Sequence, residues 1–310
     1  MLLLALFLAV AGFAATPTPA DLPLDLLPLE KPTLYIVGDG TANNAGQAKN
    51  GQPIAGWGNT LADYLNPAKV TLANVAQAGK SSRTFYNDPA NWRTVQARLK
   101  RGDLLLLVFG LHDVGPPYSS TSPGSIPGIN LESTKDLTTP DGKVEVAHTY
   151  GWYLSTMATE AQEKGARVFL LTVVPRNVWT NPKVEFRDAT PAEPPPVDYD
   201  ARNDRIERGN ANGRFTRWAK ELGQREHLPV LDVTALCADL FEKTGRETVN
   251  GLYADHNQTN AVGAHVVAGA IIAGLKTFPA SPFISLLSEK GRSLPFAELA
   301  YVQVNPAPVK

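Results

Sequence analysis

Two segments of the sequence are apolar on both faces, and they limit the folds that the chain can adopt. Residues 104–109 read LLLLVF and residues 168–174 read VFLLTVV, without the polar alternation that one exposed face would give. Strands of this kind need cover on both sides, which helices supply in parallel sheets. Segments with helical periodicity separate them from further strand-like segments. The sequence therefore predicts a three-layer α/β/α sandwich around a mostly parallel sheet.

Strand and helix alternate along most of the chain. We expect strands at residues 33–39, 70–79, 103–110, 166–175 and 228–233. We expect helices at residues 56–65, 94–102, 149–165, 212–227, 234–245 and 260–276. Two long loops, at residues 115–146 and 185–204, interrupt this order, and such loops are often functional. Because ligands bind beyond the carboxyl ends of strands in open α/β sheets, we expect a site at the turns after Val37, Ala76, Phe109 and Val174.

The start of the sequence has features of an export signal. Residues 2–15 are apolar throughout, a run too short to cross a bilayer but suited to the core of a signal peptide. We expect a signal peptide at residues 1–14 and a proline-rich spacer at residues 15–31, although no Lys or Arg precedes the apolar run. The sequence thus predicts a secreted or periplasmic protein with one main domain at residues 32–278 and a C-terminal extension at residues 279–310.

Charge and composition argue against several classes of partner. The formal net charge is −1 and no block of like charges is present, so binding of a nucleic acid through bulk charge is not expected. We also expect no integral membrane domain. The sequence has no His-x-x-x-His and no cysteine pair, so we expect no metal and no cofactor. The single Cys237 lies in an apolar stretch and is interpreted as buried. The oligomeric state is left open.

Four blocks stand at expected strand ends: GDGT at residues 38–41, AQAGKSSRTF at 76–85, VFGLHD at 108–113 and YADHNQTNAVGAH at 253–265. In this order they resemble the SGNH/GDSL hydrolase superfamily, and more narrowly the bacterial rhamnogalacturonan acetylesterase-like carbohydrate esterases. The similarity includes PTLYIVGDGTANN, GWGNTLADYL, KVEVAHTYGWYL and VVPRNVW, and extends from about Pro32 to about Leu275. The resemblance implies the flavodoxin-like α/β/α fold of that superfamily.

The resemblance also implies acyl transfer by a serine nucleophile, with a histidine base that an aspartate orients. In this family the serine follows Gly-Asp in the first block, a position that is Gly40 here. The aspartate and histidine are spaced Asp-x-x-His, which corresponds to Asp255 and Gln258. The oxyanion donors are the amide of the nucleophile, a glycine that matches Gly79, and an asparagine whose place is taken by His112.

Three of the implied positions have therefore changed, while Asp255 and Gly79 match the pattern. Glycine has no side chain that attacks an ester, and a glutamine amide does not accept a proton at neutral pH. Loss of such a triad removes on the order of 10⁶-fold in turnover in serine hydrolases. We predict that the serine-esterase mechanism is lost and that the pocket binds a small-molecule or polysaccharide ligand, which the resemblance suggests is a pectic saccharide.

Neighbouring residues have more ordinary interpretations. Ser81 and Ser82 are interpreted as caps of the helix that follows them. Thr41 points away from the nucleophile position, because side chains of adjacent residues diverge. For the same reason His256 is interpreted as a structural or rim histidine. His148 is interpreted as a packing residue at the start of a helix.

His112 and three aspartates leave other functions open. His112 ends a buried strand, and it either contacts a ligand or packs into the space beside Gly40. With Asp39, Asp113 and Asp255 it could serve a carboxylate-based glycosidase or lyase acting on a plant polysaccharide. The resemblance implies instead that Asp39 and Asp113 support their turns. A weak deacetylase with a different mechanism is a further alternative.

Overall fold

The centre of the fold is a six-stranded sheet, ordered β10-β9-β6-β3-β1-β2 in a computed structural model of the chain. The structure describes residues 30–43, 46–48, 50–120, 123–138, 142–180, 204–208, 210–295 and 301–302. The parallel strands are β1 (Thr33–Gly38), β2 (Thr71–Asn74), β3 (Leu104–Val108), β6 (Arg167–Leu171) and β9 (Val230–Leu231). The edge strand β10 (Tyr301–Val302) pairs antiparallel with β9.

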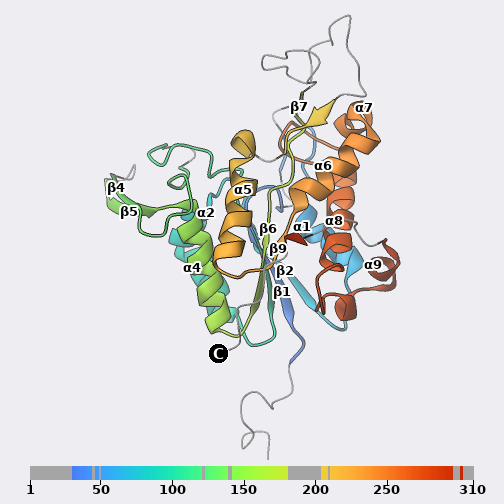
Figure 1. The fold of residues 1–310 in the computed structure, drawn as a ribbon, viewed down its shortest axis with the longest axis horizontal. Coiled ribbons are helices and arrows are strands. Elements are labelled where there is room, and N and C mark those ends of the chain that lie inside the picture. Colours follow the sequence, from blue (N-terminus) through green and yellow to red (C-terminus); the bar gives the residue numbers. More distant parts are fainter. Residues whose placement is uncertain are drawn as a thin grey trace, which may run out of the picture. The chain divides into compact units, whose positions relative to one another are not determined.

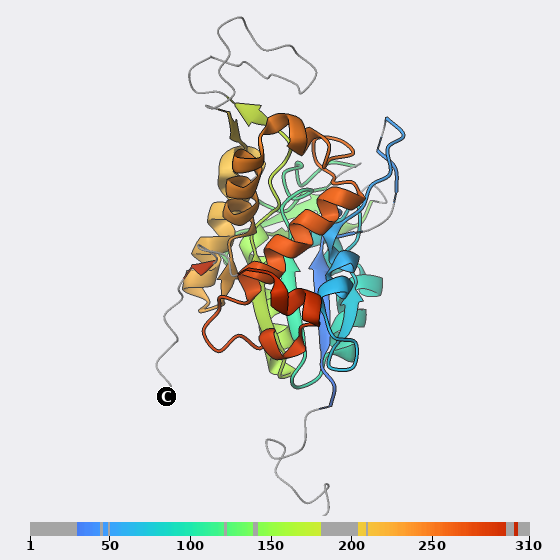
Figure 2. The same cartoon turned by 90° about the vertical axis from the view of Figure 1, so that its right-hand side faces the viewer.

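Helices cover both faces of this sheet (Figures 1 and 2). One face carries α2 (Ser82–Asn87), the π-helical η4 (Pro89–Arg93), α3 (Thr94–Arg98), α4 (Tyr150–Glu163) and α5 (Asn210–Arg225). The other carries α1 (Trp57–Thr60), the 3₁₀-helical η3 (Leu61–Tyr64), α6 (Val233–Thr244), α7 (Arg246–Asn250) and α8 (Ala261–Leu275). The predicted three-layer α/β/α sandwich with a mostly parallel sheet is confirmed.

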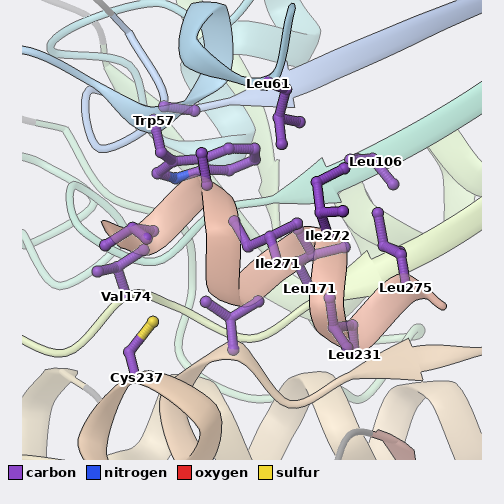
Figure 3. Packing of buried hydrophobic residues seen from close by; sticks show 14 of the residues in the cluster. Trp57, Leu61, Leu106, Leu171, Val174, Leu231, Cys237, Ile271, Ile272 and Leu275 are labelled. Carbon is purple, nitrogen blue, oxygen red and sulfur yellow. The ribbon is translucent and has the colours of Figure 1, made fainter. Parts of the chain in front are cut away.

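Residues of β1, β3, β6 and β9 point alternately into two apolar cores. On the side of α8, Leu106 packs in one cluster with Trp57 and Ile271 (Figure 3). On the side of α4, Leu105 packs in a second cluster with Tyr150. Every residue of β3 is therefore buried, which explains why its sequence has no polar face. Full burial of each such leucine contributes about 1.5–3 kcal/mol.

The long loop predicted at residues 115–146 contains regular structure. An antiparallel hairpin forms from β4 (Thr134–Thr138) and β5 (Val144–His148), so the loop prediction is wrong over these strands. Among the residues of β4 and β5, only Leu137 and Ala147 are buried, and two buried residues are too few to give an apolar period in the sequence. A second short pair joins β7 (Trp179–Thr180) to β8 (Arg205–Ile206). The other predicted loop lies between them, and its residues 185–203 are outside the described part.

The two ends of the chain differ in what the structure describes. The predicted signal peptide at residues 1–14, and the predicted spacer up to residue 29, lie outside the described residues. Residues 279–295, predicted as an extension, pack on the main domain through η6 (Ile284–Leu286) and α9 (Glu289–Ser293). Phe283 and Leu287 are fully buried in the same core as α8. Within the described ranges, no helix has the length and apolar character needed to cross a membrane.

Candidate functional site

The strand order of the sheet reverses at β1. From β1 the chain moves to β2 on one side, and it then returns to β3 on the other. Such a reversal leaves an opening beyond the carboxyl ends of the two strands that flank it. The turn at residues 39–41 follows β1, and residues 109–113 follow β3. The topology therefore brings the first and third sequence blocks to one place.

Asp39 joins these two turns. The side chain is 1% exposed, and its Oδ1 accepts hydrogen bonds from the Thr41 amide (3.0 Å) and the Thr41 hydroxyl (2.8 Å). Its Oδ2 accepts a hydrogen bond from the Leu111 amide at 2.9 Å. Asp39 thus fixes the first turn against the third, and it holds the Thr41 hydroxyl as a donor. Two asparagines connect the segment after the first block to the start of the second block. The Asn43 side chain donates a hydrogen bond to Ala76 O, and the Asn74 side chain donates one to Ala42 O.

Gly40 faces Gln258. A Cβ atom added to Gly40 would lie 3.1 Å from Gln258 Nε2 and 3.5 Å from the Cα of Ala78. The φ of Gly40 lies outside the left-handed region, so the backbone accepts any L-residue at this position. Gln258 Oε1 is buried and has no hydrogen-bond partner among the described residues. Two positions far apart in the sequence therefore stand as close as a nucleophile and its base would.

Asp255 organises the turn that carries Gln258. Its Oδ1 accepts hydrogen bonds from the amides of Asn257 and Gln258, both at 2.7 Å. His256 is exposed, and its carbonyl accepts a hydrogen bond from the Asn177 amide at 2.8 Å. The exposure of His256 agrees with its interpretation as a rim residue.

Two backbone amides at this site are not used by the fold. Gly79 has a φ of +80°, and an added Cβ would meet no atom within 4 Å. In the part of the chain that the structure describes, the amides of Gly40 and Gly79 donate no hydrogen bond. His112 is half-buried beyond the end of β3. These two amides are therefore candidate donors to an oxygen of a ligand.

A sequence profile of the GDSL-like Lipase/Acylhydrolase family matches residues 36–266, which include all four blocks. The chain belongs to this family. The rhamnogalacturonan acetylesterase of Emericella nidulans is 29% identical over 241 residues, which cover 77% of the chain and 83% of that protein. The predicted resemblance to SGNH hydrolases and rhamnogalacturonan acetylesterases is thus confirmed.

Similarity to a second relative, the uncharacterized esterase YxiM of Bacillus subtilis, is more distant. The two are 23% identical over 255 residues, which are 80% of the chain but 53% of YxiM. A crystal structure of the Bacillus subtilis protein matches with a TM-score of 0.56 at 22% identity, covering 80% of the chain and 57% of the solved one. The chain spans about half the length of YxiM, and this likeness shows a shared fold.

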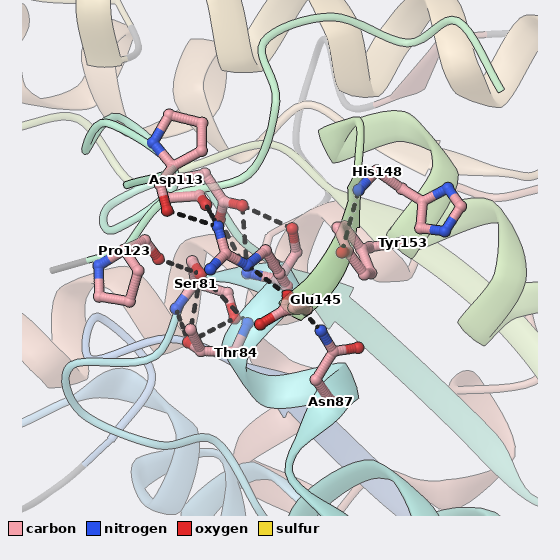
Figure 4. Close-up of polar contacts among 12 residues, drawn as sticks. Ser81, Thr84, Asn87, Asp113, Pro123, Glu145, His148 and Tyr153 are labelled. Carbon is pink, nitrogen blue, oxygen red and sulfur yellow. Dashed lines mark hydrogen bonds and ion pairs between the residues drawn. The ribbon is translucent and has the colours of Figure 1, made fainter. Parts of the chain in front are cut away.

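A second polar cluster of the GDSL-like chain surrounds the start of α2 (Figure 4). Ser81 caps α2, because its hydroxyl accepts a hydrogen bond from the Thr84 amide at 3.2 Å. Ser82 does not cap, which corrects the sequence interpretation. Its hydroxyl instead donates to Asp113 Oδ1 at 2.5 Å, and its amide lies 3.1 Å from both carboxylate oxygens. Burial raises the pKa of Asp113 to about 6, against the lowering effect of the Ser82 donors.

Arg83 extends this cluster to the hairpin. It is 4% exposed, and it donates hydrogen bonds to Pro117 O (2.7 Å) and Gly124 O (2.9 Å). Its Nε lies 2.7 Å from Glu145 Oε1 on β5. Arg83 therefore ties the loop after Asp113 and the β4–β5 hairpin to α2, a role that its sequence context did not indicate.

The carboxylates do not form an exposed acid and base pair. Asp39 and Asp113 are 1% and 2% exposed, and both already accept hydrogen bonds from the turns around them. A glycosidase needs two carboxyl groups that face a substrate cleft. The described residues also contain no group of three or more His, Cys, Asp or Glu side chains that could hold a metal ion. Supporting the turns is therefore the chemistry that suits Asp39 and Asp113.

Proposed function

We propose that this GDSL-like protein binds a saccharide at the pocket beside Gly40 and does not cleave an ester there. One observation carries the proposal: residues 40 and 258 face each other across 3.1 Å, measured from the Cβ position to Nε2. That arrangement suits a nucleophile and a base, but glycine has no nucleophile and the glutamine amide is not a base. Asp255 keeps its place in the turn without a histidine to orient.

The donors around this pocket suit an anionic or acyl oxygen. The amides of Gly40 and Gly79 donate no hydrogen bond to the described residues, and Gln258 Nε2 is a third donor next to them. Hydrogen bonds to a carboxylate are stronger than those to a neutral oxygen. A uronic acid residue of a pectic saccharide fits these donors, and the similarity to the rhamnogalacturonan acetylesterase of Emericella nidulans supports a ligand of that class. We further propose that residues 1–14 direct the protein to a secreted or periplasmic location.

A reversal of the substitutions tests the missing mechanism. The variant Gly40→Ser, His112→Asn, Gln258→His places the family's residues in the pocket. Because Gly40 has an ordinary φ and only the end of a flexible side chain within 3.1 Å, the serine needs no change of the backbone. We expect the variant to release acetate from acetylated pectin at a rate at least about 10³-fold above the wild type. Rapid deacetylation by the wild-type protein would refute the proposal.

Ligand binding is measured separately, by thermal shift with galacturonic acid oligomers. A ligand at 100 times its Kd stabilises the folded state by about 2.7 kcal/mol. We expect stabilisation by the acidic oligomers, and a weaker effect from the same oligomers with their carboxyl groups reduced to alcohols. The matched variant Gln258→Ala removes one donor and should weaken binding. Equal shifts with acidic and reduced oligomers would contradict a carboxylate at the Gly40 and Gly79 amides.

A further inference from the structure

A separate depression lies between α4 and the β4–β5 hairpin. Its volume is about 490 Å³, within the range of small-molecule sites. It is lined by one face of α4 and by the hairpin, through Trp152, Ser155, Thr156, Thr159, Thr134 and His148. None of these residues belongs to the pocket beside Gly40. Figure 4 shows the His148 ring pointing away from the Ser81–Asp113 cluster.

The stacked rings of His148 and Trp152, here called the aromatic platform, belong to the lining of the depression. The rings of His148 and Trp152 stack with centroids 3.7 Å apart and planes 12° apart. Tyr86 and Tyr153 meet the Trp152 ring edge-on, at 5.5 and 5.1 Å. Rings held in this way lose little entropy when a ligand packs on them. The C–H face of a pyranose is apolar and flat, and such faces suit aromatic side chains.

The polar groups around the platform indicate the class of sugar. Thr134, Thr156 and Thr159 line the depression, and threonine hydroxyls can both donate and accept hydrogen bonds. His148 Nδ1 is buried and has no partner among the described residues, and burial lowers the pKa of this histidine.

The charges that line the depression are negative. Glu132 and Glu160 contribute carboxylates to its wall. Glu160 is already engaged by Arg93 at 3.0 Å and by the Tyr86 hydroxyl, also at 3.0 Å. An acidic sugar would meet the like charge of Glu132 here, which costs free energy, whereas Arg93 already offsets the charge of Glu160. Hydroxyls beside an aromatic face, without a cation in the lining, favour an uncharged ligand.

We propose that the depression between α4 and the hairpin is a second saccharide site, and that it binds a neutral pyranose. The evidence for this second site is the stacked pair His148 and Trp152 together with the surrounding threonines. It does not depend on the pocket beside Gly40, because the two sites share no residue. The protein would then hold an acidic unit of a glycan at one site and a neutral unit at the other.

The test is titration of the full chain with neutral methyl pyranosides of galactose, glucose, mannose, xylose and rhamnose, and with D-galacturonic acid, by calorimetry. We expect at least one neutral glycoside to bind, and Trp152→Ala to weaken that binding by about two- to tenfold, the loss of one good ring contact. Thr159→Arg fills the depression from an exposed helix position, and it should weaken binding to the same extent. The matched control is Gln162→Arg, an exposed residue of α4 outside the lining.

Each outcome decides the proposal. Loss of binding in Thr159→Arg and not in Gln162→Arg supports it, even if Trp152→Ala does not fold. The absence of binding by any neutral glycoside overturns it, as does binding that Thr159→Arg leaves unchanged. Binding of galacturonic acid that Thr159→Arg abolishes overturns the neutral class of ligand.

Discussion

Substitution of Asp113 by asparagine should change how the stability of the protein depends on pH. Asp113 is fully buried, and burial raises the pKa of its carboxyl group from 3.8 to about 6. The folded state therefore holds this proton more tightly than the unfolded state does. As the pH rises from about 3.8 to about 6, the free energy of unfolding falls. At 1.36 kcal/mol per pK unit, the total loss is about 3 kcal/mol.

The asparagine side chain cannot ionise, but its amide oxygen can still accept the hydrogen bonds from Ser82. We expect the stability of Asp113→Asn relative to the wild type to increase with pH. The difference in unfolding free energy, variant minus wild type, should be about 2–3 kcal/mol higher at pH 7 than at pH 4. Urea unfolding followed by tryptophan fluorescence at both pH values measures this difference. The control is Asp136→Asn, an exposed aspartate on β4, which should show no such dependence. A relative stability of Asp113→Asn that stays flat or falls with pH would refute the reasoning.

Three further predictions concern the stability of the turns at the site and the burial of two core residues. Asp39→Ala removes three hydrogen bonds from Thr41 and Leu111, so urea unfolding should show a loss of about 3 kcal/mol, at about 1 kcal/mol each. Phe283→Ala should cost about 3–5 kcal/mol in thermal unfolding because the ring is fully buried, whereas a loss below about 1 kcal/mol would exclude it from the core. Burial raises the pKa of the Cys237 thiol to about 12, so iodoacetamide at pH 8 should label it in urea and not in the folded protein.

Much of the fold could be predicted because the pattern of apolar residues in its main strands and helices reflects which of their faces are buried. β3 is apolar at every position because both of its faces are covered. The hairpin β4–β5 could not be predicted, since its strands are mostly exposed and a tertiary contact, Arg83 to Glu145, ties it to α2. The segment after α8 was left unassigned because its apolar run, FISLL at residues 283–287, is too short to show a helical or strand period.

The location of the candidate site followed from strand ends, but its chemistry did not. Periodicity places Gly40 at the end of a strand and says nothing of Gln258, which only the family resemblance connected with it. His148 was interpreted as a packing residue, and it does stack on Trp152. The depression beside it depends on the hairpin facing α4, a contact between segments that no local pattern records.

The division of labour among the pocket residues has a consequence for how such a chain can change over generations. Asp39 and Asp255 each hold two or more backbone or hydroxyl donors, so their replacement weakens the fold itself. Gly40 contributes no side chain, and Gln258 Oε1 has no partner among the described residues. Selection for a folded, protease-resistant protein therefore retains the two aspartates. It does not act on the side chains at positions 40 and 258. Under that pressure alone, the shape of the pocket outlasts its reactivity.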